Sequence, residues 1–388
     1  MTPVRFAIIG CGRIANFHAD PITKMSDAEL AAVCDLLPER RQEFQEKYGV
    51  PVYSNYHTML QQENIDVMCI LTPNGMHPSH AIDVINRYSK HVVVEKPLAL
   101  AWDDLERMKI AADNAGVKIF PIYQNRYNKS VRKVRADLMS GKLGKVALGT
   151  VRQRWCRPQR YYNLSSWRGT WAMDGGTLVT QGIHFLDLLQ YLLGDVKSVV
   201  ANIATQLVDV EVEDTAVAIL KFESGALGAI EVTTTARPDI VYEEQLEEAS
   251  ISILSEHGMS VITGIAANVL SMYTSDPEAA EFHSEDFNHA YGTGHIPLLK
   301  DVVADIREGI PHPISFEDGI SAIRLLNAIY RSAEDNREVY LHEEVTSRRL
   351  GQPDQDLSDQ YTAVSYTHLR ANETEAELVC RLLLEKKK

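Results

Sequence analysis

A glycine-rich stretch near the N-terminus has the spacing of a dinucleotide-binding turn. Gly10, Gly12 and Ala15 follow a short apolar run and precede a helix-like segment. The first glycine permits a tight turn, the second lets the backbone approach a pyrophosphate, and the small alanine lets the helix pack closely on the strand. The helix N-terminus then offers free N–H groups to the phosphates. We expect the cofactor to contact Gly10, Gly12, Arg13 and Ile14.

An aspartate after the second apolar run selects between the two common dinucleotides. Asp35 lies 20 residues beyond Ala15. A carboxylate at that distance holds ribose hydroxyls and repels a 2′-phosphate, so the sequence predicts NAD as the cofactor rather than NADP. Arg40 and Arg41 close by weaken this preference slightly. The alternative is a structural glycine turn with a surface aspartate.

Two more apolar runs end in polar turns that could line the same crevice, because ligands of parallel sheets bind beyond the carboxyl ends of the strands. The third run leads into residues 71–77, and the fourth into Glu95-Lys96-Pro97, where the proline ends the strand. We expect the crevice to be lined by Thr72, Asn74, His77 and Lys96. The alternatives are a plain turn at 73–75 and a solvated lysine.

His184 is the candidate for proton transfer. It lies near the start of a helical pattern of leucines over 186–193, close to Gln181 and Asp187. An imidazole that titrates near neutrality can take a hydroxyl proton while a hydride leaves the same carbon. Taken alone, a buried structural histidine is the alternative.

Residues 152–171 contain five arginines and no acidic residue, although the chain has a formal net charge of −14. Arginine forks bind phosphate and carboxylate groups, and the interleaved aromatic residues can stack on sugar or base rings. The segment therefore predicts an anionic ligand that contains rings, unless these arginines pair with surface acids. The substrate contacts expected here and in the neighbouring polar segments are Asn125, Arg126, Arg157, Arg160, Tyr162, Arg168 and Gln181.

The elements that must position these residues follow two patterns. Up to about residue 121, β-branched runs alternate with helix-like segments, which predicts a doubly wound parallel sheet. The expected strands are 5–10, 29–35, 66–72, 91–97 and 117–120, and the expected helices are 38–47, 78–89 and 102–115. The fold class predicted for this part is an N-terminal Rossmann domain over residues 1–121.

The second pattern predicts a C-terminal α/β domain with an open, largely antiparallel sheet over residues 122–345. A helix is expected at 129–140, followed by longer alternating runs with a hairpin signal at Ser224-Gly225. Two further helices are expected at 296–308 and 316–334, the second opened by a capping box of Ser315 and Asp318, whereas 275–294 is expected to be loop.

The end of the chain divides into a polar tail, 346–364, and a segment, 365–388, that is similar to the peptide encoded by read-through into a sequencing adapter. We therefore expect the second segment to be non-native and exclude it from the fold. A real amphipathic helix is the alternative.

Composition excludes several classes of protein. The net charge of −14 and the pI of about 5.4 argue against nucleic-acid binding. No apolar run is long enough for a membrane helix, and the start is not a signal peptide. Five scattered cysteines without a CxxC pair predict neither a disulfide framework nor a metal site, which favours the cytoplasm.

With the GCGRIA turn, Glu95-Lys96-Pro97 and QGIHFLDLLQYLLG in view, the chain resembles the Gfo/Idh/MocA oxidoreductase family over about residues 3–345. The resemblance implies a Rossmann domain followed by an α/β domain whose open sheet mediates a homodimer or homotetramer. Four segments resemble, within the family, bacterial dehydrogenases that oxidise C3 of UDP-linked N-acetylamino sugar acids: RPQRYYNLSSWRGTW, DGGTLVTQGIH, VEVEDTAVAIL and YGTGHIPLLKDVV.

That second resemblance implies NAD-dependent oxidation of the C3 hydroxyl of UDP-N-acetylglucosaminuronate, in some relatives with 2-oxoglutarate as the acceptor that recycles NADH. Lys96 and His184 would be the catalytic pair. Many members carry an aspartate four residues before the histidine, but here the position is Thr180. We expect His184 to be the base and Lys96 to orient the hydroxyl, with the reverse as the alternative. Glu95, Gln124, Trp167 and Arg168 would approach the cofactor or substrate.

Two other functions stay open from the sequence. One is an inositol or simple hexose dehydrogenase of the same family, which the arginine-aromatic segment disfavours only moderately. The other is a non-catalytic NAD-binding regulator, since a fold alone does not determine an activity. The presence of both Lys96 and His184 favours an enzyme.

Overall fold

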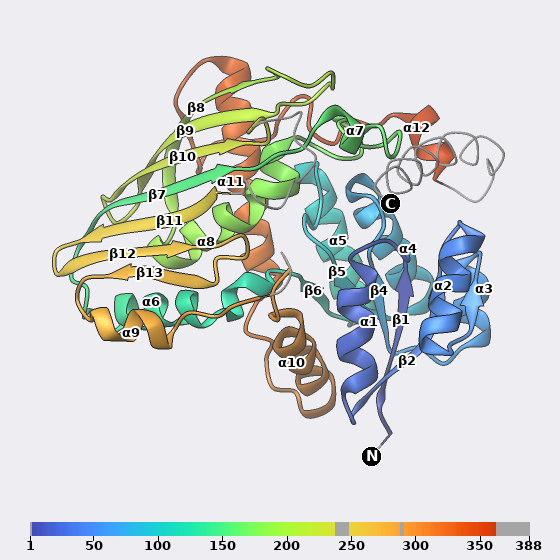
Figure 1. Ribbon diagram of the computed structural model, residues 1–388. Coiled ribbons are helices and arrows are strands. Elements are labelled where there is room, and N and C mark those ends of the chain that lie inside the picture. Colours follow the sequence, from blue (N-terminus) through green and yellow to red (C-terminus); the bar gives the residue numbers. More distant parts are fainter. Residues whose placement is uncertain (1, 237–247, 288–290, 362–388) are drawn as a thin grey trace, which may run out of the picture.

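The computed structural model describes residues 2–236, 248–287 and 291–361, so the predicted read-through segment 365–388 lies outside the described residues. The described chain builds two sheets that lie side by side with helices around them (Figure 1). The N-terminal sheet, drawn in blue and teal, lies on the right of the view, and the larger C-terminal sheet lies on the left.

The first sheet is parallel throughout and has the strand order β3-β2-β1-β4-β5-β6. Its central strands are continuous apolar runs, and every residue of Val67–Ile70 is buried because helices cover both faces. The strands are β1 Val4–Ile9, β2 Ala28–Cys34, β3 Val52–Tyr53, β4 Val67–Ile70, β5 His91–Val94 and β6 Ile119–Pro121. The helices are α1 Ala15–Lys24, α2 Pro38–Tyr48, α3 Tyr56–Gln62, α4 His77–Tyr88 and α5 Trp102–Ala115. The predicted Rossmann sheet is confirmed.

The strand order reverses between β1 and β4, and a doubly wound sheet binds its ligand at such a switch point. The turns after β1, β4 and β5 therefore meet at one edge. These are the turns that carry Gly10 and Gly12, Thr72 and Asn74, and Lys96.

The second sheet has the order β13-β12-β11-β7-β10-β9-β8-β14 and is antiparallel except for the parallel pair β7 and β10. Burial alternates along its strands, as expected for a sheet with one covered face. The covering helices α8 and α11 pack on β7 and β8. The strands are β7 Val146–Arg154, β8 Val196–Ala204, β9 Thr215–Phe222, β10 Leu227–Thr233, β11 Glu248–Ser255, β12 Gly258–Thr263, β13 Val269–Tyr273 and β14 Val339–Tyr340. The prediction of a largely antiparallel sheet is confirmed.

The remaining helices are α6 Lys129–Met139, α7 Gln159–Tyr162, α8 Ile183–Leu193, α9 Pro277–Phe282, α10 His295–Glu308, α11 Phe316–Asp335 and α12 Gln355–Gln360. The capping box of Ser315 and Asp318 is present at the start of α11. The prediction of loop over 275–294 is wrong at α9, a short surface helix whose N-cap, Asp276, accepts a hydrogen bond from Ala279 N. No residue of α9 is buried, so it lacks the apolar periodicity that would have indicated a helix.

Helix α10 returns from the second sheet to the first, where it packs against α1 and β1. The four cysteines within the described ranges are buried and form no disulfide. None of the helices described here has the length and apolar character needed to cross a bilayer.

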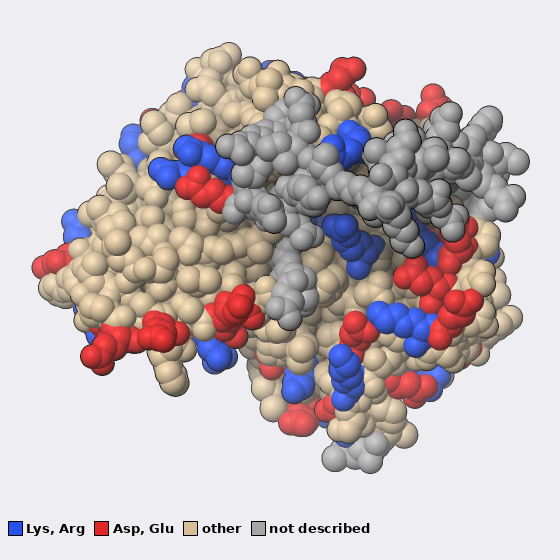
Figure 2. Space-filling model, in the orientation of Figure 1, with Lys and Arg blue, Asp and Glu red and all other residues tan. Residues whose placement is uncertain are grey.

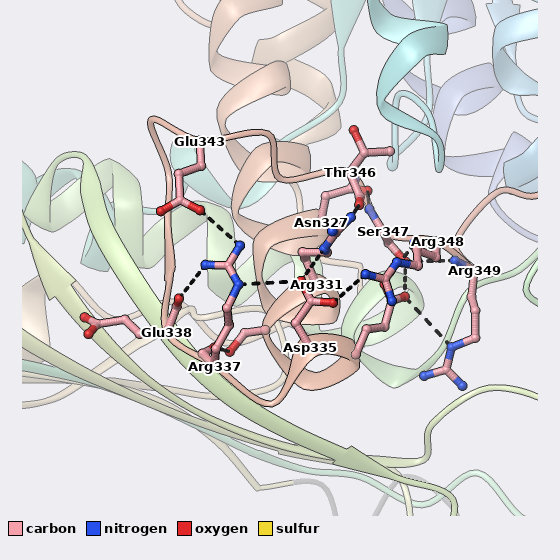
Figure 3. Close-up of polar contacts among 12 residues, drawn as sticks. Asn327, Arg331, Asp335, Arg337, Glu338, Glu343, Thr346, Ser347, Arg348 and Arg349 are labelled. Carbon is pink, nitrogen blue, oxygen red and sulfur yellow. Dashed lines mark hydrogen bonds and ion pairs between the residues drawn. The ribbon is translucent and has the colours of Figure 1, made fainter.

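After β14 the chain runs back along α11, and polar contacts hold the two segments together (Figure 3). Asp335 accepts hydrogen bonds from Arg331, 2.7 Å away, and from Arg348, 2.8 Å away. Ser347 Oγ donates to Glu334 at 2.6 Å. We call residues 343–361 the C-terminal strap. It continues through α12, which lies near α7 in Figure 1.

Candidate active site

The glycine turn after β1 has the geometry of a pyrophosphate cradle. Gly10 has φ 94°, and a Cβ at this position would lie 2.6 Å from the carbonyl oxygen of Leu71. Only glycine therefore fits where β1 and β4 meet. A Cβ on Gly12 would meet nothing within 4 Å, and α1 begins three residues later at Ala15. Open space beside a helix N-terminus fits the pyrophosphate of a dinucleotide.

Asp35 stabilises this turn. Its Oδ2 accepts a hydrogen bond from Cys11 N at 2.7 Å, and its Oδ1 accepts one from Leu37 N at 2.8 Å. Arg41 donates to the main-chain carbonyl of Asp35 and so has a structural role. Of the two arginines that weaken the preference for NAD, Arg40 lies with a guanidinium nitrogen 3.8 Å from the carboxylate.

The turn after β4 connects the crevice to the second half of the chain. Asn74 Nδ2 donates to the carbonyl oxygen of Asp174 at 2.8 Å, and Thr72 Oγ1 hydrogen-bonds to His80 Nδ1 at 3.0 Å. His77 is fully buried, with its nitrogens 2.7 Å from Pro97 O and 2.8 Å from Thr72 O. His77 therefore connects two turns of the crevice, and its contact with the cofactor stays a prediction.

Lys96 reaches from the end of β5 across to the second half of the chain. Its ammonium donates a hydrogen bond of 2.7 Å to the carbonyl oxygen of Thr180. Thr180 lies in a π-helical turn, Leu178–Gly182, that leads directly into α8. The wider register of such a turn takes its carbonyls out of the ordinary helical pattern, and turns of this kind are frequent at functional sites. The main chain of Thr180 thus supplies an acceptor for Lys96.

His184 lies in the first turn of α8, four residues after Thr180. Burial, followed by the charge of Lys96, lowers the pKa of His184 to about 3. Burial also lowers the pKa of Lys96, although Glu95 and Asp174 oppose this shift. His184 Nδ1 is buried and has no hydrogen-bond partner within the described residues. Both groups are therefore desolvated, and the lowered pKa of His184 makes its imidazole neutral at physiological pH.

Glu95 forms a buried cluster with two histidines that the sequence did not single out. His18 Nε2, from α1, lies 2.8 Å from Glu95 Oε1, and His295 Nε2, from the start of α10, lies 3.6 Å from the same oxygen. Burial alone would raise the pKa of Glu95, but the hydrogen bonds and charges of the two histidines hold it well below its usual value. The donor set and spacing resemble those of a metal site, yet the close His18 contact is a hydrogen bond, so we assign an ion-pair cluster.

Asp174 is a second residue that sequence reasoning missed. Its side chain is buried, and Oδ2 accepts a hydrogen bond of 2.7 Å from Gly169 N. Burial raises the pKa of Asp174 to about 7, and Oδ1 has no partner among the residues described. The group lies close enough to Lys96 to shift the pKa of the amine. The feature of the sequence that could have identified Asp174 was its position at the start of the Asp-Gly-Gly motif, residues 174–176.

The arginine-aromatic segment divides between the site and the surface. The guanidinium of Arg168 lies over the rings of Tyr161 and Trp167, at 4.3 and 4.9 Å from their centres. Arg157 lies over Trp155 at 5.2 Å. The charges of both guanidinium groups lower the pKa of Lys96.

The other arginines of that segment lie elsewhere. Arg152 and Arg154 pair with Glu231 and Glu248 on the outer face of the second sheet, as the surface-pairing alternative predicted. Arg160 is exposed on α7. Tyr162 is buried, with its hydroxyl 3.4 Å from Thr234 Oγ1.

The polar segment after β6 has a different role from the one expected. Arg126 is buried and binds Asp187 through two hydrogen bonds of 2.6 and 3.0 Å, and Asp318 through a third of 2.8 Å. Its guanidinium is therefore committed to a structural ion-pair cluster, which corrects the substrate contact predicted for Arg126. Asn125 and Gln124 are buried next to it, and Gln124 Oε1 has no partner in the described part of the chain. Gln181 is buried with its side-chain oxygen against Thr180 Oγ1.

Comparison with known proteins agrees with this geometry. A family model described as an oxidoreductase family with an NAD-binding Rossmann fold matches residues 4–123. A second, described as the C-terminal alpha/beta domain of that oxidoreductase family, matches residues 135–341.

The chain is also similar to individual proteins along most of its length. The crystal structure of the WlbA dehydrogenase from Bordetella pertussis, in complex with NADH and UDP-GlcNAcA, superposes with a TM-score of 0.80 at 36% identity, covering 87% of this chain and 98% of that one. The myo-inositol 2-dehydrogenase of Thermotoga maritima is 28% identical over 88% of this chain and 99% of its own length. The D-glucoside 3-dehydrogenase of Escherichia coli is 26% identical over 88% and 98%.

Proposed function

The chain belongs to the Gfo/Idh/MocA oxidoreductase family, and from that premise we propose that it oxidises the C3 hydroxyl of a nucleotide-linked sugar acid by transferring a hydride to NAD. The single observation that supports this chemistry best is the 2.7 Å hydrogen bond from Lys96, at the end of β5, to the carbonyl oxygen of Thr180, which lies four residues before His184.

The residues of the first sheet fit NAD. The main chain at Gly12 and the start of α1 would hold the pyrophosphate, and Asp35 would bind the adenosine ribose. When bound, NAD supplies the acceptor for the hydride. Glu95 precedes Lys96 in this turn, and its 2.8 Å hydrogen bond with His18 and its 3.6 Å contact with His295 connect the turn to α1 and α10.

We propose that the proton of the hydroxyl goes to Lys96 Nζ. The pKa of Lys96 is lowered by burial, so that a neutral amine becomes accessible, whereas the pKa of His184 is held at about 3 and makes it a poor acceptor. His184 would hydrogen-bond to the hydroxyl and orient it. This assignment is the reverse of the one expected from the sequence alone.

The substrate class that we propose rests on the positive charges of two arginines. Arg157 and Arg168 bring two guanidinium groups, each stacked on aromatic rings, next to Lys96. Guanidinium groups bind phosphate and carboxylate oxygens, which a nucleotide-linked sugar acid offers and an uncharged inositol or hexose does not. The structural neighbour that contains UDP-GlcNAcA supports UDP-N-acetylglucosaminuronate as the first substrate to test.

The curated relatives favour a second candidate, an inositol or simple hexose. Native mass spectrometry of the purified protein separates the two candidates, because it detects both co-purified dinucleotide and an added sugar. We expect a bound mass for NAD and a further mass for UDP-N-acetylglucosaminuronate, but none for myo-inositol at the same concentration. Binding of myo-inositol alone would contradict the proposed substrate.

A separate experiment tests whether 2-oxoglutarate recycles the cofactor. It is added to the complex that holds NADH, and the loss of NADH absorbance is followed.

We also propose a cytoplasmic homodimer or homotetramer that forms through the outer face of the second sheet. This face presents apolar side chains that are at least 38% exposed, namely Val200, Val217, Ile219, Leu227, Leu254 and Met272. Figure 2 shows a broad area with few charged side chains in the region where Figure 1 draws this sheet. Light scattering of wild type and Ile219→Arg tests the interface, and a monomeric wild type would contradict it.

A further inference from the structure

The C-terminal strap begins beyond the region that the family models match, which ends at residue 341. Its composition predicts a polar tail, but several of its side chains are buried. Leu350 is 1% exposed and Leu357 is 7% exposed. Because a solvated tail would expose such residues, the strap is an integral part of the packed structure.

The first part of the strap is fixed to α11. Ser347 N donates to Asn327 Oδ1 at 3.1 Å, while Asn327 Nδ2 donates to the carbonyl oxygen of Leu100 at 3.3 Å (Figure 3 shows the contact of Asn327 with the strap). One buried amide thus joins the strap to the segment that follows Glu95-Lys96-Pro97. Gly351 crosses this segment so closely that a Cβ would lie 2.6 Å from Ala101 N.

The strap then reaches the loop that carries Trp167 and Arg168. Gly351 N donates to the carbonyl oxygen of Trp171 at 2.9 Å, and the guanidinium of Arg349 lies 4.5 Å from the centre of the Trp171 ring. The strap therefore contacts Trp171 twice, through a main-chain hydrogen bond and through the ring.

Helix α12 makes the second set of contacts with this loop. Leu357 shares a buried cluster with Met173 and Met76, and Trp167 packs against this cluster. Ser166 Oγ donates to Gln360 Oε1 at 2.7 Å and hydrogen-bonds to the hydroxyl of Tyr361 at 2.9 Å. The neighbours of Trp167 and Arg168 in the sequence are therefore held by the strap.

We propose that Leu357, Gln360 and Tyr361 are positioning residues for substrate, because α12 holds Trp167 and Arg168 in the orientation that receives the anionic part of the sugar nucleotide. Residues 163–171 form no regular helix or strand, so fixing them on binding would cost conformational entropy. A loop that is already fixed avoids this cost and binds more tightly. The identity of the ligand rests on the function proposed above, but the ordering of the loop does not.

The experiment compares Leu357→Ala and the double variant Gln360→Ala/Tyr361→Phe with wild type. Gln355→Ala is the matched control, because Gln355 is exposed on the same helix and contacts only Asp359 within it. We expect both strap variants to raise the KM for UDP-N-acetylglucosaminuronate about five- to thirty-fold, as the loss of one or two such contacts implies. The kcat and the dissociation constant of NAD should remain those of the control.

Hydrogen exchange of residues 163–171 without ligand gives the second readout, and it does not depend on the proposed substrate. We expect exchange in this segment to rise in both strap variants and to stay unchanged in Gln355→Ala. Unchanged exchange together with unchanged KM would overturn the proposal, as would an equal loss of NAD binding. A wild type that turns over no sugar nucleotide would contradict the proposed function, while the exchange data would still decide the role of the strap. The double variant alters only polar surface contacts, so it decides the matter if Leu357→Ala does not fold.

Discussion

The ammonium of Lys96 donates a hydrogen bond of 2.7 Å to the main-chain carbonyl of Thr180, and this contact joins the two halves of the active site. It involves the π-helical turn before α8, in which Thr180 lies. A neutral acceptor adds no charge to the site. Burial lowers the pKa of Lys96, and the charges of Arg157 and Arg168 lower it further.

The pH dependence of catalysis should follow Lys96. Because the pKa of the amine is lowered, kcat/KM should rise with pH, with an apparent pKa below the 10.5 of a free lysine. The imidazole of His184 should add no inflection near pH 6.5, because its pKa is lowered to about 3. The measurement is a pH–rate profile of wild type, His184→Gln and Lys96→Met. We expect the ascending limb to survive in His184→Gln, and its disappearance there would restore the histidine as the base.

Alanine substitutions at Gly10 and Gly12 should affect two different properties, thermal stability and NAD binding. Gly10→Ala places a Cβ 2.6 Å from Leu71 O at φ 94°, so we expect a lower melting temperature. Gly12→Ala meets nothing within 4 Å, so its melting temperature should match wild type while NAD binds about tenfold or more weakly, since the methyl group occupies the pyrophosphate position. Thermal unfolding and NAD titration of both variants provide the check. A Gly12→Ala protein with wild-type NAD affinity would remove the cradle from the site.

Arg126 should matter for stability and not for substrate affinity. Arg126→Met leaves the buried carboxylate of Asp187 without its partner, and breaking such a pair costs about 3–5 kcal/mol. Lys109→Met is the control, because Lys109 pairs with Asp113 on the exposed side of α5, where such a pair changes the free energy of unfolding only slightly. Urea unfolding gives both values. A stable Arg126→Met variant with a raised KM would show that the arginine binds substrate after all.

Glu213 should make folding less favourable as pH rises. Burial raises the pKa of Glu213 from 4.5 to about 7, so the folded state keeps a proton that the unfolded state releases. The free energy of unfolding should therefore fall between about pH 4.5 and pH 7 and level off above that range. Glu213→Gln keeps an oxygen for Leu178 N and the hydroxyl of Tyr330 and removes this titration. The stability gained by the variant over wild type should grow from pH 5 to pH 8 by about 1–3 kcal/mol. A gain that is equal at both pH values would show that Glu213 is ionised in the folded protein.

The first sheet was predictable because its strands are short apolar runs in a regular alternation with helices. That pattern is local. It also predicted that the glycine turn, Thr72 and Lys96 meet at the carboxyl edge of this sheet. The parallel pairing of β7 with β10 was not predictable, since it joins strands that lie about 80 residues apart and no local pattern sets such a register. Helix α9 was missed because it buries no apolar side chain.

The candidate site was predictable only where a motif fixed the local structure. Arg126 was assigned to substrate because its partners, Asp187 and Asp318, lie 61 and 192 positions further along the chain. Asp174 and the two histidines around Glu95 were missed for the same reason, since burial and distant neighbours give them their properties. The burial of Leu350 and Leu357 in the strap was not predictable, because polar residues surround both leucines in the sequence.

The most direct test of the account is the formation of NADH in a single turnover, followed at 340 nm after the protein with bound NAD is mixed with UDP-N-acetylglucosaminuronate. We predict one NADH per active site in wild type. Lys96→Met should form NADH about 10²–10⁴-fold more slowly with NAD still bound, as expected when a positioned proton acceptor is lost. NADH formation at the wild-type rate in Lys96→Met would contradict the assignment of Lys96, and its absence in wild type with NAD bound would contradict the proposed substrate.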